Sequence, residues 1–213
     1  VRPILDDVKE RGAAALRDFE EKFDHVRPKN LRVPVEAIKD ALTTLDPEVR
    51  AAIEESVRRA RAVAANQVPK DFYTDLAEGA RVAERWIPIQ RVGLYVPGGQ
   101  GGNTPLLSSM LMNAIPALVA GVPRVAVCTP PRKDGTINPH ILAAAHLLDI
   151  DEIYRVGGAW SIGAMAYGTQ SIDPVDVIAG PGNIYVATAK RLVQGTVGID
   201  MVAGPSEVLV VAD

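Results

Sequence analysis

In the first 85 residues, apolar and charged residues recur at the spacing of amphipathic helices. Apolar positions lie three or four residues apart over residues 4–23, and residues 46–67 carry a stronger pattern of the same kind. Asp46 precedes the second helix and has a side chain that suits the N-cap position. Between the two we expect a short strand or turn and a further helix that begins at Val35. This predicts an N-terminal helical part over residues 1–85, which we expect to be an incomplete first domain.

After residue 86 the pattern changes to short, continuous apolar runs. Continuous hydrophobicity is typical of strands that are covered on both faces, and the intervals between the runs have the length of a crossover helix with its two loops. The sequence therefore predicts an α/β fold with a parallel sheet wound in βαβ units over residues 86–203. The four runs are VGLYV (92–96), RVAVCT (124–129), EIYRV (152–156) and VDVIA (175–179).

A fifth apolar run, residues 207–211, is rich in β-branched residues and indicates a buried strand. It either extends the same sheet or crosses back to another one. The chain begins at Val1 rather than at methionine, and nothing follows this run except Ala212 and Asp213. We therefore expect the 213 residues to be part of a longer protein. Residues 204–213 would then form the first strand that returns to the truncated first domain.

The charge balance gives no electrostatic reason to expect a nucleic-acid or membrane partner. The chain has 23 Lys and Arg residues against 26 Asp and Glu residues, a net charge of −3. Its one cysteine, Cys128, cannot form an internal disulfide, which favours a reducing compartment. No apolar run reaches 18 residues, and the N-terminus lacks the layout of a signal peptide. We expect a cytoplasmic protein.

Ligands in open parallel sheets bind at the carboxyl ends of the strands, so the loops after the predicted strands are the candidate site. The loop at 97–105 (PGGQGGNTP) is rich in glycine, which suits either a ligand-binding turn or a structural one; it matches neither the P-loop nor G-x-G-x-x-G. The turn at 180–183 (GPGN) precedes a helix whose N-terminus would suit an anionic group. An ordinary strand-to-helix turn is the alternative there.

Other reactive residues are few. Gly157 and Gly158 precede a helix of small residues, and Trp160 at its start either covers the core or stacks on a ligand. Ser206 is a candidate hydrogen-bonding residue, but no G-x-S-x-G motif surrounds it, which argues against a nucleophile. Cys128 is expected to be a buried structural thiol. The three histidines, which we interpret as surface or core residues, form no plausible zinc site: His25, His140 and His146.

Longer stretches of the second half resemble the L-histidinol dehydrogenase family. The similarity runs from about residue 86 to residue 213, with a more diffuse match before it, and is most specific in GPGNIYV and AGPSEVL. The resemblance implies incomplete Rossmann-like domains of the aldehyde-dehydrogenase-like type. It also implies a zinc-containing homodimer that uses two NAD in succession to oxidise histidinol, through histidinal, to histidine, which is the last step of histidine biosynthesis.

The resemblance also assigns residues. Tyr95 matches an NAD-contacting tyrosine, Asn183 an NAD-contacting asparagine, and Ser206 a substrate-contacting serine; Trp160 stands where the family usually has a third NAD contact, a glutamine. The family's zinc ligands and its Glu-His acid/base pair lie beyond residue 213. This chain would thus hold no catalytic or metal-binding residue and would be inactive alone. The alternatives are a dehydrogenase of the same family for another small hydroxy compound and a non-catalytic nucleotide-binding module.

Overall fold

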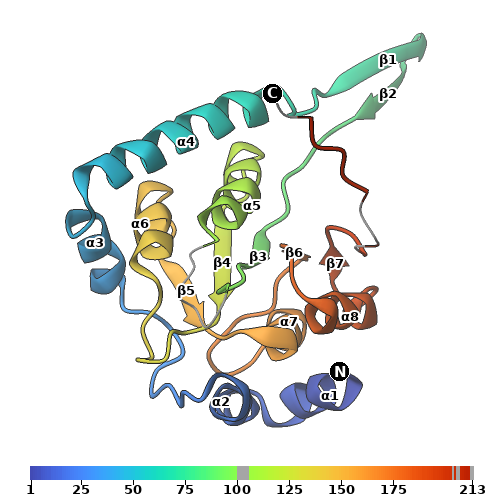
Figure 1. The fold of residues 1–213 in the computed structure, drawn as a ribbon. Helices are drawn as coiled ribbons and strands as arrows, with labels where there is room; N and C mark the ends of the chain where they lie inside the picture. The colour runs from blue at the N-terminus through green and yellow to red at the C-terminus, as the bar shows by residue number, and fades with distance from the viewer. Residues whose placement is uncertain (100–105, 203, 205–206, 212–213) are drawn as a thin grey trace.

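The computed structural model describes residues 1–99, 106–202, 204 and 207–211. Its centre is a five-stranded sheet in the order β5-β4-β3-β6-β7, in which all neighbouring strands are parallel (Figure 1). The parallel α/β sheet and the four predicted strands are confirmed. The strands are β3 (Arg91–Tyr95), β4 (Arg124–Thr129), β5 (Glu152–Arg155), β6 (Val177–Ala179) and β7 (Gly198–Ile199).

The strand order reverses once. The chain starts in the middle at β3, moves outward to β4 and β5, then returns to the other side of β3 to form β6 and β7. The carboxyl ends of β3 and β6 therefore lie side by side where the direction of winding changes, which is where ligands bind in sheets of this kind. The crossover helices are α5 (Leu107–Val119), α6 (Pro139–Leu147), α7 (Gly158–Tyr167) and α8 (Ile184–Val193).

Two hydrophobic cores cover the two faces of the sheet. Along β3, Val92 and Leu94 belong to one core and Tyr95 to the other, as expected because successive side chains of a strand point to opposite faces. Helices α5 and α6 pack in the first core together with α3 (Val35–Thr43) and α4 (Pro47–Ala65). Helices α7 and α8 pack in the second core with the N-terminal helices, on the opposite side of the sheet (Figure 1).

The predicted N-terminal helices are present, with one irregularity. The helical region expected over residues 4–23 consists of α1 (Arg2–Arg11), α2 (Ala13–Phe19) and the π-helix η1 (Glu20–Asp24). Gly12 separates the first two with a φ of 57°. In α4 the predicted cap is confirmed, since Asp46 Oδ1 accepts a hydrogen bond of 2.8 Å from the backbone N–H of Glu48. The N-terminal part thus contributes helices to both faces of the sheet.

Two segments differ from the sequence-based expectations. Residues 72–84, expected within a helical part, form an exposed antiparallel hairpin of β1 (Phe72–Ala77) and β2 (Ala80–Glu84) that projects from the body (Figure 1). The prediction of a buried strand at 207–211 was wrong for this structure, because these residues form no strand and Val208, Leu209, Val210 and Val211 are 78–89% exposed. An apolar run forms a buried strand only where it pairs with a sheet edge, and in the described structure residues 207–211 pair with none.

Candidate functional site

A cavity of about 880 Å³ lies at the carboxyl ends of the strands, where the winding of the sheet reverses. It brings together the loops that follow β3, β4, β5 and β6, along with side chains of the N-terminal helices. Tyr95, Trp160 and Asn183, which were singled out from the sequence, all line it. Ser206, the predicted substrate contact, lies outside the described residues.

The turn after β6 is fixed directly against the end of β3. Gly180 has a φ of 128°, and a side chain there would lie 2.1 Å from the backbone oxygen of Tyr95. The buried Lys190 donates a hydrogen bond of 3.0 Å to the Gly180 carbonyl and forms an ion pair with Asp200. Asp200 Oδ2 in turn accepts a hydrogen bond of 3.0 Å from the Gly180 N–H. Both polar groups of this glycine are therefore held by one ion pair, whose lysine is buried and whose aspartate is partly exposed.

The N-terminus of α8 opens into the same cavity. Asn183 caps the helix, because its Oδ1 accepts hydrogen bonds from the N–H groups of Tyr185 (3.0 Å) and Val186 (3.1 Å). Its side-chain NH₂ remains as a donor, and within the described part of the chain no acceptor meets the N–H groups of Gly182 and Asn183. A side chain on Gly182 would lie 2.4 Å from Val186 Cγ1, so only glycine fits there. Free N–H groups and the helix dipole make this end suitable for an anion.

Tyr95 contributes a neutral hydroxyl to the cavity. Burial raises the pKa of the phenol well above its ordinary value, and the nearby carboxyl groups of Asp24 and Glu20 raise it further, while the backbone N–H of Gly158 opposes them. At neutral pH the side chain is therefore protonated and can donate a hydrogen bond to a ligand.

Trp160 combines the two roles that the sequence left open, because it is buried in the core and also forms part of the cavity wall. Its ring packs against two aromatic residues, with centroid distances of 5.8 Å to Phe19 and 5.2 Å to Phe23, and these two rings also lie 6.3 Å from each other. Gly158 lies under the same ring, where a side chain would approach it to 2.3 Å. The indole N–H is already bonded to Glu20, at 2.6 Å, and so is not free to contact a ligand.

Glu20 and Asp24 are site residues that the sequence did not reveal. Glu20 is fully buried, and its Oε1 accepts hydrogen bonds from Trp160 Nε1 and from the Gly157 N–H at 2.7 Å. Burial, and next the charge of Asp24, raise the pKa of Glu20 to about 8. Asp24 is half-buried and lines the cavity, and burial raises its pKa too. In the sequence, two acids four residues apart in EEKFD are typical of a solvated helix face, so no signal distinguished them.

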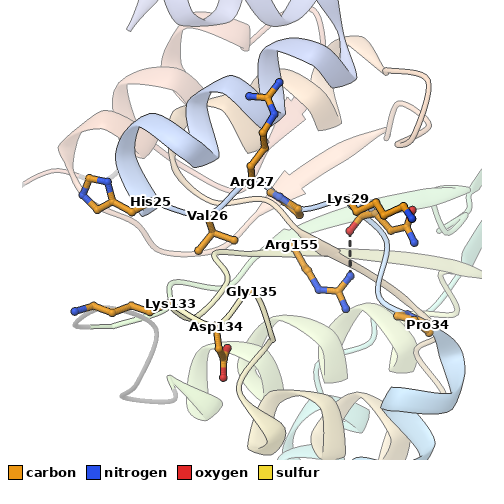
Figure 2. A pocket seen from close by; sticks show the side chains of 11 residues that line it. His25, Val26, Arg27, Lys29, Pro34, Lys133, Asp134, Gly135 and Arg155 are labelled. Atoms are coloured by element: carbon orange, nitrogen blue, oxygen red, sulfur yellow. Dashed lines mark hydrogen bonds between the residues drawn. The ribbon is translucent and has the colours of Figure 1, made fainter.

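A second hollow, of about 540 Å³, has a basic lining that includes His25, Lys133 and Arg155 (Figure 2). Its arginines are engaged within the fold. Arg27 pairs with Asp18 and Glu21 and points away from the hollow, and Arg155 donates to the backbone oxygens of Asn30 and Arg32. The bonds of Arg155 join the segment after η1 to the end of β5, and those of Arg27 join it to α2 and η1. These arginines therefore have a structural role.

Two further properties concern the described residues as a whole. Among them, no three His, Cys, Asp or Glu side chains gather closely enough to hold a metal ion. Nor does any helix in the described part of the chain have the length and apolar character needed to cross a membrane.

Comparison with known proteins identifies the family. The sequence profile described as histidinol dehydrogenase matches residues 1–213. The chain belongs to the histidinol dehydrogenase family. It is 71% identical to the histidinol dehydrogenase of Bifidobacterium longum over its whole length, which covers 47% of that protein. It is 54% identical to the enzyme of Corynebacterium efficiens, again over its whole length and over 48% of that protein.

A solved structure agrees with this family assignment. The crystal structure of histidinol dehydrogenase from Elizabethkingia anophelis matches with a TM-score of 0.89 and 38% identity, over 96% of this chain and 47% of that one. The predicted Rossmann-like fold is thereby confirmed. The chain spans about half the length of the curated relatives that it matches.

Proposed function

We propose that this chain forms the NAD-binding part of an enzyme that oxidises L-histidinol to L-histidine through histidinal, in the last step of histidine biosynthesis. The observation that carries the proposal is the convergence of Tyr95, Gly182 and Asn183 on one cavity at the point where the sheet reverses its winding. Membership of the histidinol dehydrogenase family supports the substrate and the reaction.

The described residues fit a dinucleotide. A cavity of about 880 Å³ is large enough for a cofactor of this size, and its wall combines apolar surface with few polar groups. The N–H groups of Gly182 and Asn183 would bind the pyrophosphate, with the Asn183 side-chain NH₂ as a further donor. The hydroxyl of Tyr95 would donate to a neighbouring oxygen of the nucleotide. Bound NAD supplies the hydride acceptor for both oxidation steps.

The remaining functions belong to the longer protein in this proposal. Ser206 would contact histidinol. The resemblance to the family implies that the zinc ligands and the acid/base pair lie beyond residue 213 and that the chain alone would be inactive. The described residues themselves do not fit a zinc site. The natural enzyme would be a cytoplasmic homodimer that acts on a small molecule and has no nucleic-acid or membrane partner.

A second candidate substrate remains because Trp160 replaces the usual glutamine of the family. A dehydrogenase of this family could act on another small hydroxy compound. Because the Trp160 N–H is bonded to Glu20, its ring contributes shape to the wall rather than a polar contact. Turnover of histidinol, compared with that of other amino alcohols by the natural full-length protein, distinguishes the two substrates.

Two capping residues provide a matched test of the cofactor site. Asn183 caps α8 at the cavity, whereas Asp46 caps α4 far from it in the fold, and each accepts from the backbone of its helix. Replacing either by alanine should cost about 1 kcal/mol of stability. In the natural full-length protein, we expect Asn183→Ala to weaken NAD binding in calorimetry while Asp46→Ala leaves it unchanged. Equal affinities in the two variants would refute the proposed site.

A further inference from the structure

Strand β4 lacks the acidic residue that its place in the sheet calls for. In dinucleotide-binding sheets of this order, the carboxylate that binds the ribose follows the second strand of the winding, which is β4 here. That strand ends at Thr129 and continues into Pro130 and Pro131, none of which is ionisable. The next acid along the chain, Asp134, is exposed and accepts hydrogen bonds from the N–H and hydroxyl groups of Thr136.

Asp24 brings a carboxyl group to this position from the N-terminal π-helix. Gly157, which follows β5, shows the arrangement: a side chain there would lie 2.7 Å from Pro130 Cβ and 3.4 Å from Asp24 Oδ2. Asp24 and Pro130 thus pack against the same glycine, beside the carboxyl ends of β4 and β5. Both also line the cavity that holds Tyr95 and Asn183.

The deeper burial of Glu20, against the two N–H groups that donate to it, keeps the charge on Asp24. Oε1 of Glu20 accepts two hydrogen bonds, but no group in the described part of the chain donates to Glu20 Oε2 or to Asp24 Oδ2. Two carboxyl groups can bond to each other only if one of them carries a proton. Glu20 is fully buried and Asp24 is half-buried, so the proton is favoured on Glu20 and the negative charge on Asp24.

We infer that Asp24 accepts a hydrogen bond from the 2′-hydroxyl of the adenosine ribose of NAD. The inference rests on the proposed function, since it concerns the same cavity. It assigns a binding role to a residue outside the loops of the sheet and makes Glu20 its positioning partner. A carboxylate at this position also repels a 2′-phosphate, so the site should bind NAD in preference to NADP.

The test combines a variant with a modified ligand. The natural full-length protein, its Asp24→Asn variant and an Asp40→Asn control are titrated by calorimetry with NAD and with its 2′-deoxyadenosine analogue. Asp40 is an exposed acid on α3, on the other side of the sheet. We expect Asp24→Asn to weaken NAD binding by about 10-fold, the scale of a hydrogen bond to a charged group. The analogue should bind the wild type and Asp24→Asn equally, and Asp40→Asn should match the wild type.

The outcomes separate this inference from the proposed function. If Asp24→Asn weakens both ligands equally, or neither, the contact with the 2′-hydroxyl is refuted. The wild type alone gives an independent reading should the variant fold poorly: it must bind the analogue about 10-fold more weakly than NAD, and equal affinities overturn the inference. Loss of NAD binding in Asn183→Ala with no loss in Asp24→Asn leaves the proposed function intact. A wild type that binds no NAD overturns both.

Discussion

The indole N–H of Trp160 and the carboxyl group of Glu20 form a hydrogen bond of 2.6 Å inside the protein. This bond joins helix α7, which covers the central sheet, to the N-terminal π-helix. The same carboxyl oxygen also accepts from the N–H of Gly157, the residue before α7. One buried side chain therefore fixes both the wall of the cavity and the helix that carries Asp24.

Substitutions of Glu20 should separate its hydrogen bonds from its charge. Glu20→Ala leaves the N–H groups of Trp160 and Gly157 buried without an acceptor, which should lower the free energy of unfolding by about 2 to 4 kcal/mol. Glu20→Gln retains a carbonyl oxygen for both donors and offers an NH₂ group to Asp24. We expect its stability at neutral pH to lie within about 1 kcal/mol of the wild type, as measured by urea denaturation. A glutamine variant as unstable as the alanine variant would contradict this role.

The stability difference between the wild type and Glu20→Gln should depend on pH. The pKa of Glu20 is about 8 in the folded protein against 4.5 ordinarily, so the folded state keeps a proton that the unfolded chain has released. Relative to the variant, the wild type should therefore lose stability as pH rises from about 4.5 to about 8, by up to about 1.4 kcal/mol per pH unit. Asp24, which interacts directly with Glu20, is present in both proteins. So are the other titratable groups that interact with Glu20 or Asp24, namely His25, Tyr95 and Cys128.

Urea denaturation of both proteins at a series of pH values checks this expectation. A difference that stays constant across the range, or one that grows in favour of the wild type, would show that Glu20 is not held protonated.

The Lys190–Asp200 ion pair at the turn after β6, in which the lysine is buried, should contribute more stability than a fully exposed pair. Lys190→Met removes the donor to the Gly180 carbonyl and leaves Asp200 without its cation. We expect a loss of about 1 to 3 kcal/mol in thermal unfolding, together with weaker NAD binding. Arg124→Met, which breaks the exposed pair with Asp173, is the matched control and should cost less than about 1 kcal/mol. Similar losses in the two variants would mean that the Lys190–Asp200 pair does not fix the turn.

Two glycines with positive φ distinguish steric contact from backbone strain. At Gly195, with a φ of 94°, an added side chain would meet nothing within 4 Å, so Gly195→Ala should cost about 1 kcal/mol. At Gly180 the side chain would also collide with the Tyr95 backbone at 2.1 Å. Gly180→Ala should therefore cost clearly more and weaken NAD binding as well, as judged by thermal unfolding and calorimetry. If both alanines were tolerated equally, β3 and β6 would not be in close contact.

The sheet was largely predictable because its strands are covered on both faces. Continuous apolar runs gave four strands, and the run at 124–129 coincides with β4. Strand β7 has only two residues, Gly198 and Ile199, and is too short to leave a pattern. The hairpin at 72–84 is exposed on both faces, so no buried face imposes alternation on it. Residues 207–211 are apolar, as a buried strand requires, but they form no strand in this structure. Whether such a run becomes a strand depends on pairing with a sheet edge, which the local sequence does not specify.

The site was predictable only in part, for a similar reason. The glycine-rich loop and the GPGN turn were candidate sites from the sequence, and the family resemblance then assigned Tyr95 and Asn183 beside them. Glu20 and Asp24 carry no such mark, because their burial depends on how the N-terminal helices pack against α7. The sequence singled out Trp160 at the start of its helix, but its bond to Glu20 spans 140 positions of the chain and is visible only in three dimensions.

The central claim is that the start of α8 and the end of β3 bind NAD, and the most direct test is to follow their backbone amides. In the natural full-length protein, NAD should shift the amide resonances of Gly182, Asn183 and Tyr95 in a saturable manner. The amide resonances of Gly79 and Gly195, which lie outside the cavity, should not shift. Saturable binding of NAD that leaves the first three resonances unmoved would contradict the account.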